Sequence, residues 1–226
     1  MPDSLHDLNA VTSLITAERA RALMVDLARV PSPLTELLEA EPKLRAFIDT
    51  AVEPRLREIG LTDIHRDSMG NLLATCGRGT SGRSLMLVTN AMTQPASTMP
   101  NPYAGEVRDG TPYGLPGEVV LGKGLSEQKA PLAAILLALR SVLAARIQLS
   151  GQLVFLCCVS GETGRRDAIC ARSAEARSRV RARCMNATSG GRISLSYAQK
   201  RRTPLHPCAG ARGSASSCQE LTQGGG

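Results

Sequence analysis

Residues 122–139 read GKGLSEQKAPLAAILLAL, a glycine turn followed by a Ser-Glu-Gln-Lys group and an unbroken apolar run. The run predicts a buried helix that extends to about Ala145, with Ser126 as its N-cap and Pro131 early enough to be tolerated. Charge is costly to desolvate, so a Glu and a Lys at the start of this helix call for an explanation. Glu127 alone could be a capping residue, because the helix dipole stabilises a carboxylate there.

The segments on either side of this helix predict strands. Residues 84–90 (SLMLVTN) and 151–159 (GQLVFLCCV) are apolar runs of the kind found in strands buried on both faces. Residues 91–117 are rich in Pro, Gly, Thr and Asn and predict one long loop. Strand, loop, helix and strand form an α/β unit with a mostly parallel or mixed central sheet, whose sites lie at the carboxyl ends of the strands. The polar or sulfur-bearing groups at such ends are Asn90 with Met92, Glu127 and Glu162.

The first 77 residues predict helices and then a hairpin. Residues 18–30 have an apolar face at helical spacing, and the helix that they predict ends before Pro31. A second helical region is expected from about Thr35 to Ile59, broken or kinked by Pro42 and Pro54. Residues 61–77 change to strand-like patterning around a Ser-Met-Gly turn, which predicts a β-hairpin.

The balance of charged residues changes at residue 164. Residues 1–164 carry 15 Lys and Arg against 17 Asp and Glu, whereas residues 165–226 carry 12 against 3, a net charge of +9. The second segment holds only six Ile, Leu, Val or Phe residues, too few to offset the entropy cost of ordering it. We therefore expect a domain over 1–164 and a basic low-complexity tail over 165–226 that is mostly disordered.

The tail leaves an interaction function open. Its arginines could neutralise phosphates, but the segment is poor in aromatic residues for base stacking, so we do not expect nucleic-acid binding. Four cysteines in the tail form no CxxC pair, which argues against a structural zinc site. Cys76, Cys157 and Cys158 lie in apolar segments, as suits a reducing cytoplasm. We expect a cytoplasmic protein without a membrane segment or export leader.

Four segments occur in the order typical of one known family. They are D-x-x-G-N at 67–71, VTNAMTQP at 88–95, GKGLSEQKAPLAA at 122–134 and VFLCCVSGETG at 154–164. Over roughly residues 15–165 the chain resembles the amino-terminal catalytic half of the co-catalytic zinc hydrolases. That family includes acetylornithine deacetylase, succinyl-diaminopimelate desuccinylase, aminoacylases and glutamate carboxypeptidases. The resemblance implies a zinc-exopeptidase-like α/β fold, here a partial three-layer sandwich that lacks the dimerisation domain.

The resemblance also assigns roles to positions. Asn90 falls where the family has a metal-binding His, and Met92 where an Asp supports that His. Glu127 falls on the aspartate that bridges two metals, and Glu162 on a further ligand. Gly161 occupies the position of the general base. The candidate metal set is thus Asn90, Glu127 and Glu162, for Zn, Mn or Co if any metal binds, and no catalytic base is present.

Three hypotheses follow from these departures. The first is a divergent, truncated member of the amide-hydrolysing family that is inactive or weakly active as this chain. The second is an active hydrolase with an altered single-metal site, acting on N-acyl amino acids or peptides. The third is a non-enzymatic binding protein acting through the basic tail. The sequence does not define the oligomeric state.

Overall fold

The computed structural model describes residues 9, 11–77, 81–161, 181–187 and 193–197, and for the last two segments only the backbone. Its centre is a six-stranded sheet in the order β1-β2-β6-β3-β7-β8. The strands are β1 (Asp63–Arg66), β2 (Leu72–Cys76), β3 (Arg83–Asn90), β6 (Gln152–Cys158), β7 (Arg181–Ala187) and β8 (Ile193–Tyr197). Strand β3 runs parallel to both β6 and β7, and the other pairs are antiparallel. The predicted α/β fold with a mixed sheet is confirmed.

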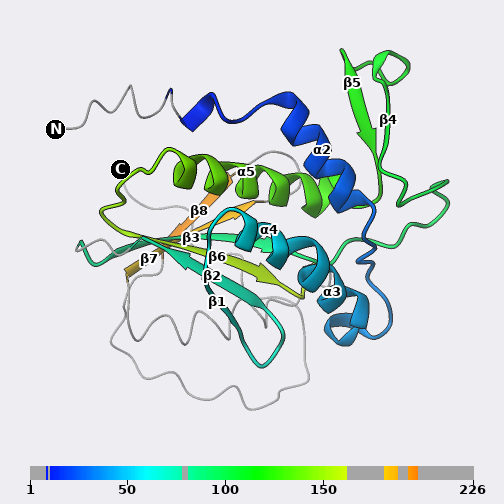
Figure 1. The fold of residues 1–226 in the computed structure, drawn as a ribbon. Helices are drawn as coiled ribbons and strands as arrows, with labels where there is room; N and C mark the ends of the chain where they lie inside the picture. Colours follow the sequence, from blue (N-terminus) through cyan, green and yellow to red (C-terminus); the bar gives the residue numbers. More distant parts are fainter. Residues whose placement is uncertain (1–8, 10, 78–80, 162–180, 188–192, 198–226) are drawn as a thin grey trace, which may run out of the picture.

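Helices cover one face of this sheet (Figure 1). Helix α2 (Ala17–Ala28) ends shortly before Pro31, as predicted. The second helical region divides where its prolines require, because proline fits only the first turn of a helix. Pro42 opens α3 (Pro42–Phe47), and Pro54 lies in the first turn of α4 (Glu53–Glu58). The short helices η1 (Leu38–Ala40) and η2 (Ile48–Val52) fill the region before and between them.

The apolar helix α5 (Ala130–Ala144) follows a wider π-helical turn, η4 (Leu125–Lys129). The prediction of Ser126 as N-cap is therefore wrong: Gly124 precedes the first turn, and no side chain caps it. Gly124 has φ +84°, a left-handed conformation that glycine adopts without steric cost. The backbone conformation of Gly124, and not a hydroxyl cap, starts this helix.

The core lies between the helices and the sheet. Alternation along the strands sends Leu72, Ala74, Phe155 and Cys157 to the helical face, where they pack with apolar residues of α3, η2, α4 and α5. The opposite face carries a smaller buried cluster: Leu73, Val88, Leu156 and Cys158. Among the residues whose side chains are described, the helical face therefore holds the larger buried apolar cluster.

The predicted long loop over 91–117 is partly wrong. It contains strand β4 (Glu106–Asp109), which pairs with β5 (Glu118–Leu121) in a separate two-stranded ribbon that projects from the body (Figure 1). Strand β4 reads EVRD and is exposed along its whole length, so it lacks the apolar alternation that identifies a strand in sequence.

Two segments of the expected disordered tail are strands. Strand β7 pairs with β3 in parallel, and β8 pairs with β7, so both extend the central sheet. The expectation concerned most of the tail, and these two short strands do not test it. The rest of residues 165–226 lies outside the described residues, and the division of the chain at residue 164 remains a prediction.

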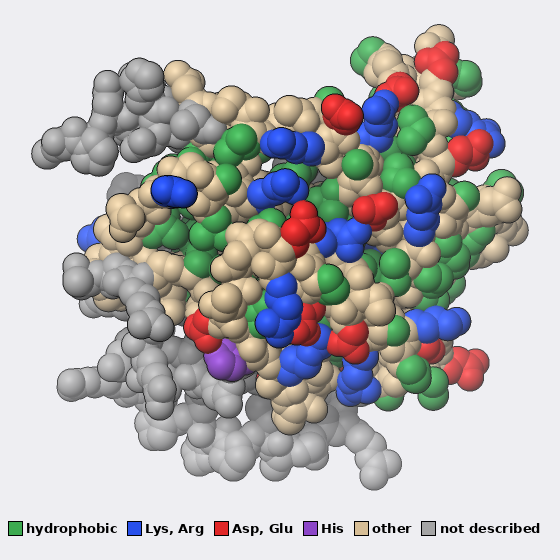
Figure 2. Space-filling view, viewed as in Figure 1, with side chains coloured by type: hydrophobic (Ala, Val, Ile, Leu, Met, Phe, Trp, Pro, Cys, Tyr) green, Lys and Arg blue, Asp and Glu red, His purple; other side chains and the backbone are tan. Residues whose placement is uncertain are grey.

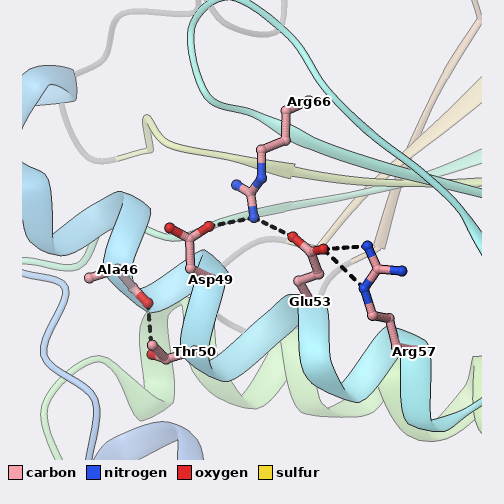
Figure 3. A network of polar contacts seen from close by, with 6 residues as sticks. All are labelled: Ala46, Asp49, Thr50, Glu53, Arg57 and Arg66. Atoms are coloured by element: carbon pink, nitrogen blue, oxygen red, sulfur yellow. Dashed lines mark hydrogen bonds and ion pairs between the residues drawn. The ribbon is translucent and has the colours of Figure 1, made fainter.

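A charged network joins the helices to the edge strand β1. The guanidinium group of Arg66 lies between the carboxylates of Asp49 and Glu53, and Arg57 pairs with Glu53 one turn along (Figure 3). Hydrogen bonds from Arg57 and Arg66 lower the pKa of Glu53. Exposed ion pairs contribute little individually, but this network fixes α4 against the end of β1.

The visible surface is of mixed charge. Figure 2 shows Lys and Arg side chains interspersed with Asp and Glu over the described part of this face, as expected from the near-neutral residues 1–164. Within the described segments, none of the helices has the length and apolar character needed to span a membrane.

The D-x-x-G-N motif forms the β1–β2 turn and ties it to β6. Asp67 Oδ1 accepts hydrogen bonds from the backbone N–H of Met69 and Asn71, and Gly70 has φ +93°. The buried Asn71 amide donates to Asp67 Oδ2 at 2.8 Å and accepts from the Val159 N–H at 2.9 Å. Asn71 thus holds the end of β6 next to the hairpin.

Replacement of Asn71 by Ala tests this tie. The Asn71→Ala variant would leave the buried Val159 N–H without its partner, which typically costs about 1–3 kcal/mol. We expect the free energy of unfolding to fall by about 2 kcal/mol in urea titrations, and Thr98→Ala, at an exposed position, to change it by less than about 0.5 kcal/mol. Equal effects of the two substitutions would contradict the role of Asn71.

Candidate functional site

The segment that leaves β3 is fixed by backbone pairing with residues 32–34. Ala91, Met92 and Thr93 are almost completely buried. The Thr93 N–H donates to the Ser32 carbonyl at 2.9 Å, and the Leu34 N–H donates to the Thr93 carbonyl at 2.7 Å. Thr93 is therefore paired with residues 32–34 just beyond the carboxyl end of β3.

The glycine turn before η4 lies directly against this segment. A Cβ atom at Gly124 would lie 2.3 Å from Thr93 Cγ2, and one at Gly122 would lie 2.8 Å from Ala28 Cβ. Real Cβ atoms essentially never approach another heavy atom this closely, because contacts below 3.0 Å force something to shift. Both glycines of the GKG turn are thus required by close packing, at Gly124 in addition to its positive φ.

Lys129 is buried at the end of η4, with no exposed surface. Its ammonium group donates to the Val30 carbonyl at 2.7 Å and lies 5.2 Å from the ring centroid of Phe47 and 5.7 Å from that of Tyr103. Burial lowers the pKa of Lys129 to about 8, against a smaller opposing influence of Glu127. Lys129 joins the start of α5 to the segment after α2, and it is a structural lysine that solvent does not reach.

Glu127 lies beside the same segment but is only partly buried. Its Oε1 accepts from Lys123 Nζ at 2.6 Å, and its Oε2 accepts from the Gln94 N–H at 2.9 Å. The side chains of Glu127 and Lys123 are 21% and 17% exposed. Glu127 therefore connects η4 to the chain after β3 and does not cap its own helix.

Asn90 and Gly161 lie against each other. Asn90 is the last residue of β3, and a Cβ atom at Gly161 would lie 2.8 Å from Asn90 Cβ and 3.3 Å from the Met92 carbonyl. The Asn90 Oδ1 atom is buried and has no hydrogen-bond partner among the described residues. The first expected ligand position and the expected base position are thus in direct contact, and a side chain at 161 would need Asn90 to move.

The proposed metal set is only partly described. Asn90 and Glu127 both lie near the carboxyl end of β3, while Glu162 lies outside the described residues. Within 11–77 and 81–161, no group of three His, Cys, Asp or Glu residues could hold a metal ion. Met92 is buried at the position of a supporting carboxylate, where a thioether cannot accept an N–H bond strongly. These described donors do not fit a two-metal centre.

Comparisons with known proteins rest on structure alone. No protein-family model matches the sequence, and no curated protein matches it. The di-peptidase Dug1p from Saccharomyces cerevisiae superposes with a TM-score of 0.62 at 15% identity, over 83% of this chain and 42% of that chain. The M20 family metallo-carboxypeptidase Sso-CP2 from Sulfolobus solfataricus gives 0.59 at 14% identity, over 76% and 37%. Human carnosine dipeptidase 1 gives 0.50 at 18% identity, over 78% and 36%.

The described fold is similar to that of part of these peptidases, one of which is an M20 family metallo-carboxypeptidase. The likeness confirms the fold implied by the motifs, at identities that show the fold alone. The chain spans less than half the length of these solved structures.

The sequence reasoning missed the contacts that define the candidate site. It did not assign a role to Lys123, although Lys123 and Glu127 have the i, i+4 spacing of a helical ion pair. It also missed the hydrogen bond from the Gln94 N–H, because a backbone donor has no sequence signal. The tie between Lys129 and the Val30 carbonyl joins residues 99 positions apart, which local patterns do not show.

Two glycine substitutions separate conformational strain from packing at the turn. Gly114 has φ +71° and open space where a Cβ atom would lie, whereas Gly124 has φ +84° and a close neighbour. We expect Gly114→Ala to lower the free energy of unfolding by about 1 kcal/mol through backbone strain, and Gly124→Ala by about 3 kcal/mol or more. Urea titrations measure both, and equal losses would show that Thr93 does not restrict position 124.

The buried Lys129 predicts a pH dependence. Its pKa of about 8 in the folded protein lies below the ordinary value of 10.5, so between these values the unfolded chain binds more protons and rising pH favours folding. We expect the free energy of unfolding of the wild type to rise relative to Lys129→Met between about pH 7 and pH 10, by at most about 3 kcal/mol. A difference between the two proteins that does not change with pH would contradict this.

Proposed function

We propose that this chain is a divergent relative of the metal-dependent peptidases and amidohydrolases, and that it hydrolyses amide bonds weakly or not at all. The observation that carries the proposal is the contact between Gly161 and Asn90. It supports the loss of the general base, because neither the residue nor the space for its side chain is present at that position.

The chemical cost of this loss is large. A general base typically contributes about 10² to 10⁴ in rate by accepting a proton from the attacking water. Among the remaining groups near the carboxyl end of β3, the carboxylate of Glu127 already accepts two hydrogen bonds. An amide at Asn90 is a weak ligand compared with imidazole. Family-type substrates, which are N-acyl amino acids and short peptides, would therefore be turned over slowly even with Zn, Mn or Co added.

One observation favours the second hypothesis, an active hydrolase with a single metal. The Oδ1 atom of Asn90 is a buried acceptor without a partner in the described part of the chain, and such atoms are rare unless a ligand or water satisfies them. A metal held there would need Glu162 and a carboxylate oxygen of Glu127 as further ligands. The third hypothesis, binding through the basic tail, concerns residues that lie largely outside the described part of the chain.

An activity assay tests the proposed function. The full chain is incubated with Zn²⁺, Mn²⁺ or Co²⁺ and a panel of N-acyl amino acids and dipeptides, and release of free amine is followed. We expect the rate to be within about tenfold of the rate with Glu127→Gln, which keeps the shape of the side chain but removes its charge. Metal-dependent turnover that is abolished by both Glu127→Gln and Glu162→Gln would overturn the proposal.

A further inference from the structure

The carboxylate of Glu127 has a partner on each oxygen, and one partner is a full positive charge. Lys123 Nζ lies 2.6 Å from Oε1, within the range of a charge-assisted hydrogen bond. The Gln94 N–H occupies Oε2 at 2.9 Å. Because Lys123 and Glu127 are both partly buried, solvent screens this pair less than the exposed pairs of the surface.

The backbone holds Lys123 in this position from both sides. The Lys123 N–H donates to the Pro102 carbonyl at 2.6 Å. The neighbouring Gly122 and Gly124 pack so closely that neither tolerates a Cβ atom without movement. The backbone of Lys123 therefore belongs to a fixed turn, and the ion pair with Glu127 costs only the rotamer freedom of the two side chains.

The electrostatics oppose a divalent ion at the same carboxylate. A metal ion that approached Oε1 would have to displace the Lys123 ammonium group, which lies 2.6 Å from that oxygen. Displacement would leave a partly buried lysine without its partner, which is costly.

We propose that Lys123 is the resident cation of this site, neutralising Glu127 where the M20 fold would otherwise present that carboxylate to a metal ion. The inference rests on the proposed function, since a chain without metal-dependent hydrolysis has no need for a free carboxylate at 127. Lys123 then acts as a positioning residue: with Glu127 it fixes the chain after β3 to the start of α5. A helix-capping role for Glu127 is excluded by its partners, which lie outside the helix.

The test compares thermal unfolding in EDTA and in Mn²⁺, a cation that prefers oxygen ligands and competes little for the cysteines. We expect Lys123→Met to unfold at a lower temperature than the wild type in EDTA. We expect Mn²⁺ to raise the Tm of Lys123→Met by at least about 3 °C more than that of the wild type. Lys123→Gln serves as a second variant if Lys123→Met does not fold.

Two controls make the result specific. Lys123→Arg keeps the positive charge and should show no larger Mn²⁺ effect than the wild type. Lys123→Met combined with Glu127→Gln should lose the additional Mn²⁺ effect, because the carboxylate that it exposes is gone. The proposal is overturned if Mn²⁺ raises the Tm of the wild type as much as that of Lys123→Met, or raises neither.

The outcome is independent of the activity assay. Wild-type turnover would contradict the proposed function whatever the Tm values are. A missing difference between Lys123→Met and the wild type would contradict the role of Lys123 even if the chain proves inactive.

Discussion

The parallel pairing of β3 with β6 is the constraint on which the candidate site depends. Their register places Asn90 opposite Cys158, and the Ala91 N–H continues the ladder by donating to the Cys158 carbonyl at 2.8 Å. Both strands therefore end at the same edge of the sheet, and the chain leaves them side by side. This brings Gly161 against Asn90 and holds Val159 within reach of Asn71. The positions expected to carry catalysis lie together because two strands end together, whatever side chains occupy them.

Two glycines at this edge illustrate different consequences of close packing. Gly124 is required by the fold, because the turn before η4 has a positive φ and presses on Thr93. At Gly161 the nearest atom to an added Cβ would be the Cβ of Asn90, an atom that every residue except glycine carries. Restoring a carboxylate at 161 therefore requires the backbone of residue 161 or of residue 90 to shift, whatever side chain stands at 90.

Most of the fold could be predicted from local signals, and the errors have identifiable causes. Pro42 and Pro54 indicate helix starts, because proline lacks an N–H donor and has a fixed φ. The continuous apolar sequences of β3 and β6 indicate buried strands. Strand β4 was missed because a fully exposed strand has no apolar alternation. The strands β7 and β8 were missed because the low apolar content of the tail favoured disorder, whereas strand pairing with β3 supplies backbone hydrogen bonds that composition does not register. Tertiary pairing overrides composition in both cases.

The location of the candidate site could be predicted from the sequence, but the interactions of its side chains could not. Motif order located Asn90, Glu127 and Gly161 at one edge of the sheet, yet a carboxylate at the start of a helix is equally suited to capping, to metal binding or to an ion pair. Which of these applies depends on what lies within about 3 Å, and that is set by the left-handed turn at Gly124 and by the conformation after β3. In this chain the nearest groups are an ammonium and a backbone N–H, and both satisfy the carboxylate without any ligand. A resemblance in sequence predicts the position of a residue, whereas the neighbours of that residue decide its chemistry. For Glu127 the decisive neighbour is Lys123, four residues earlier in the chain.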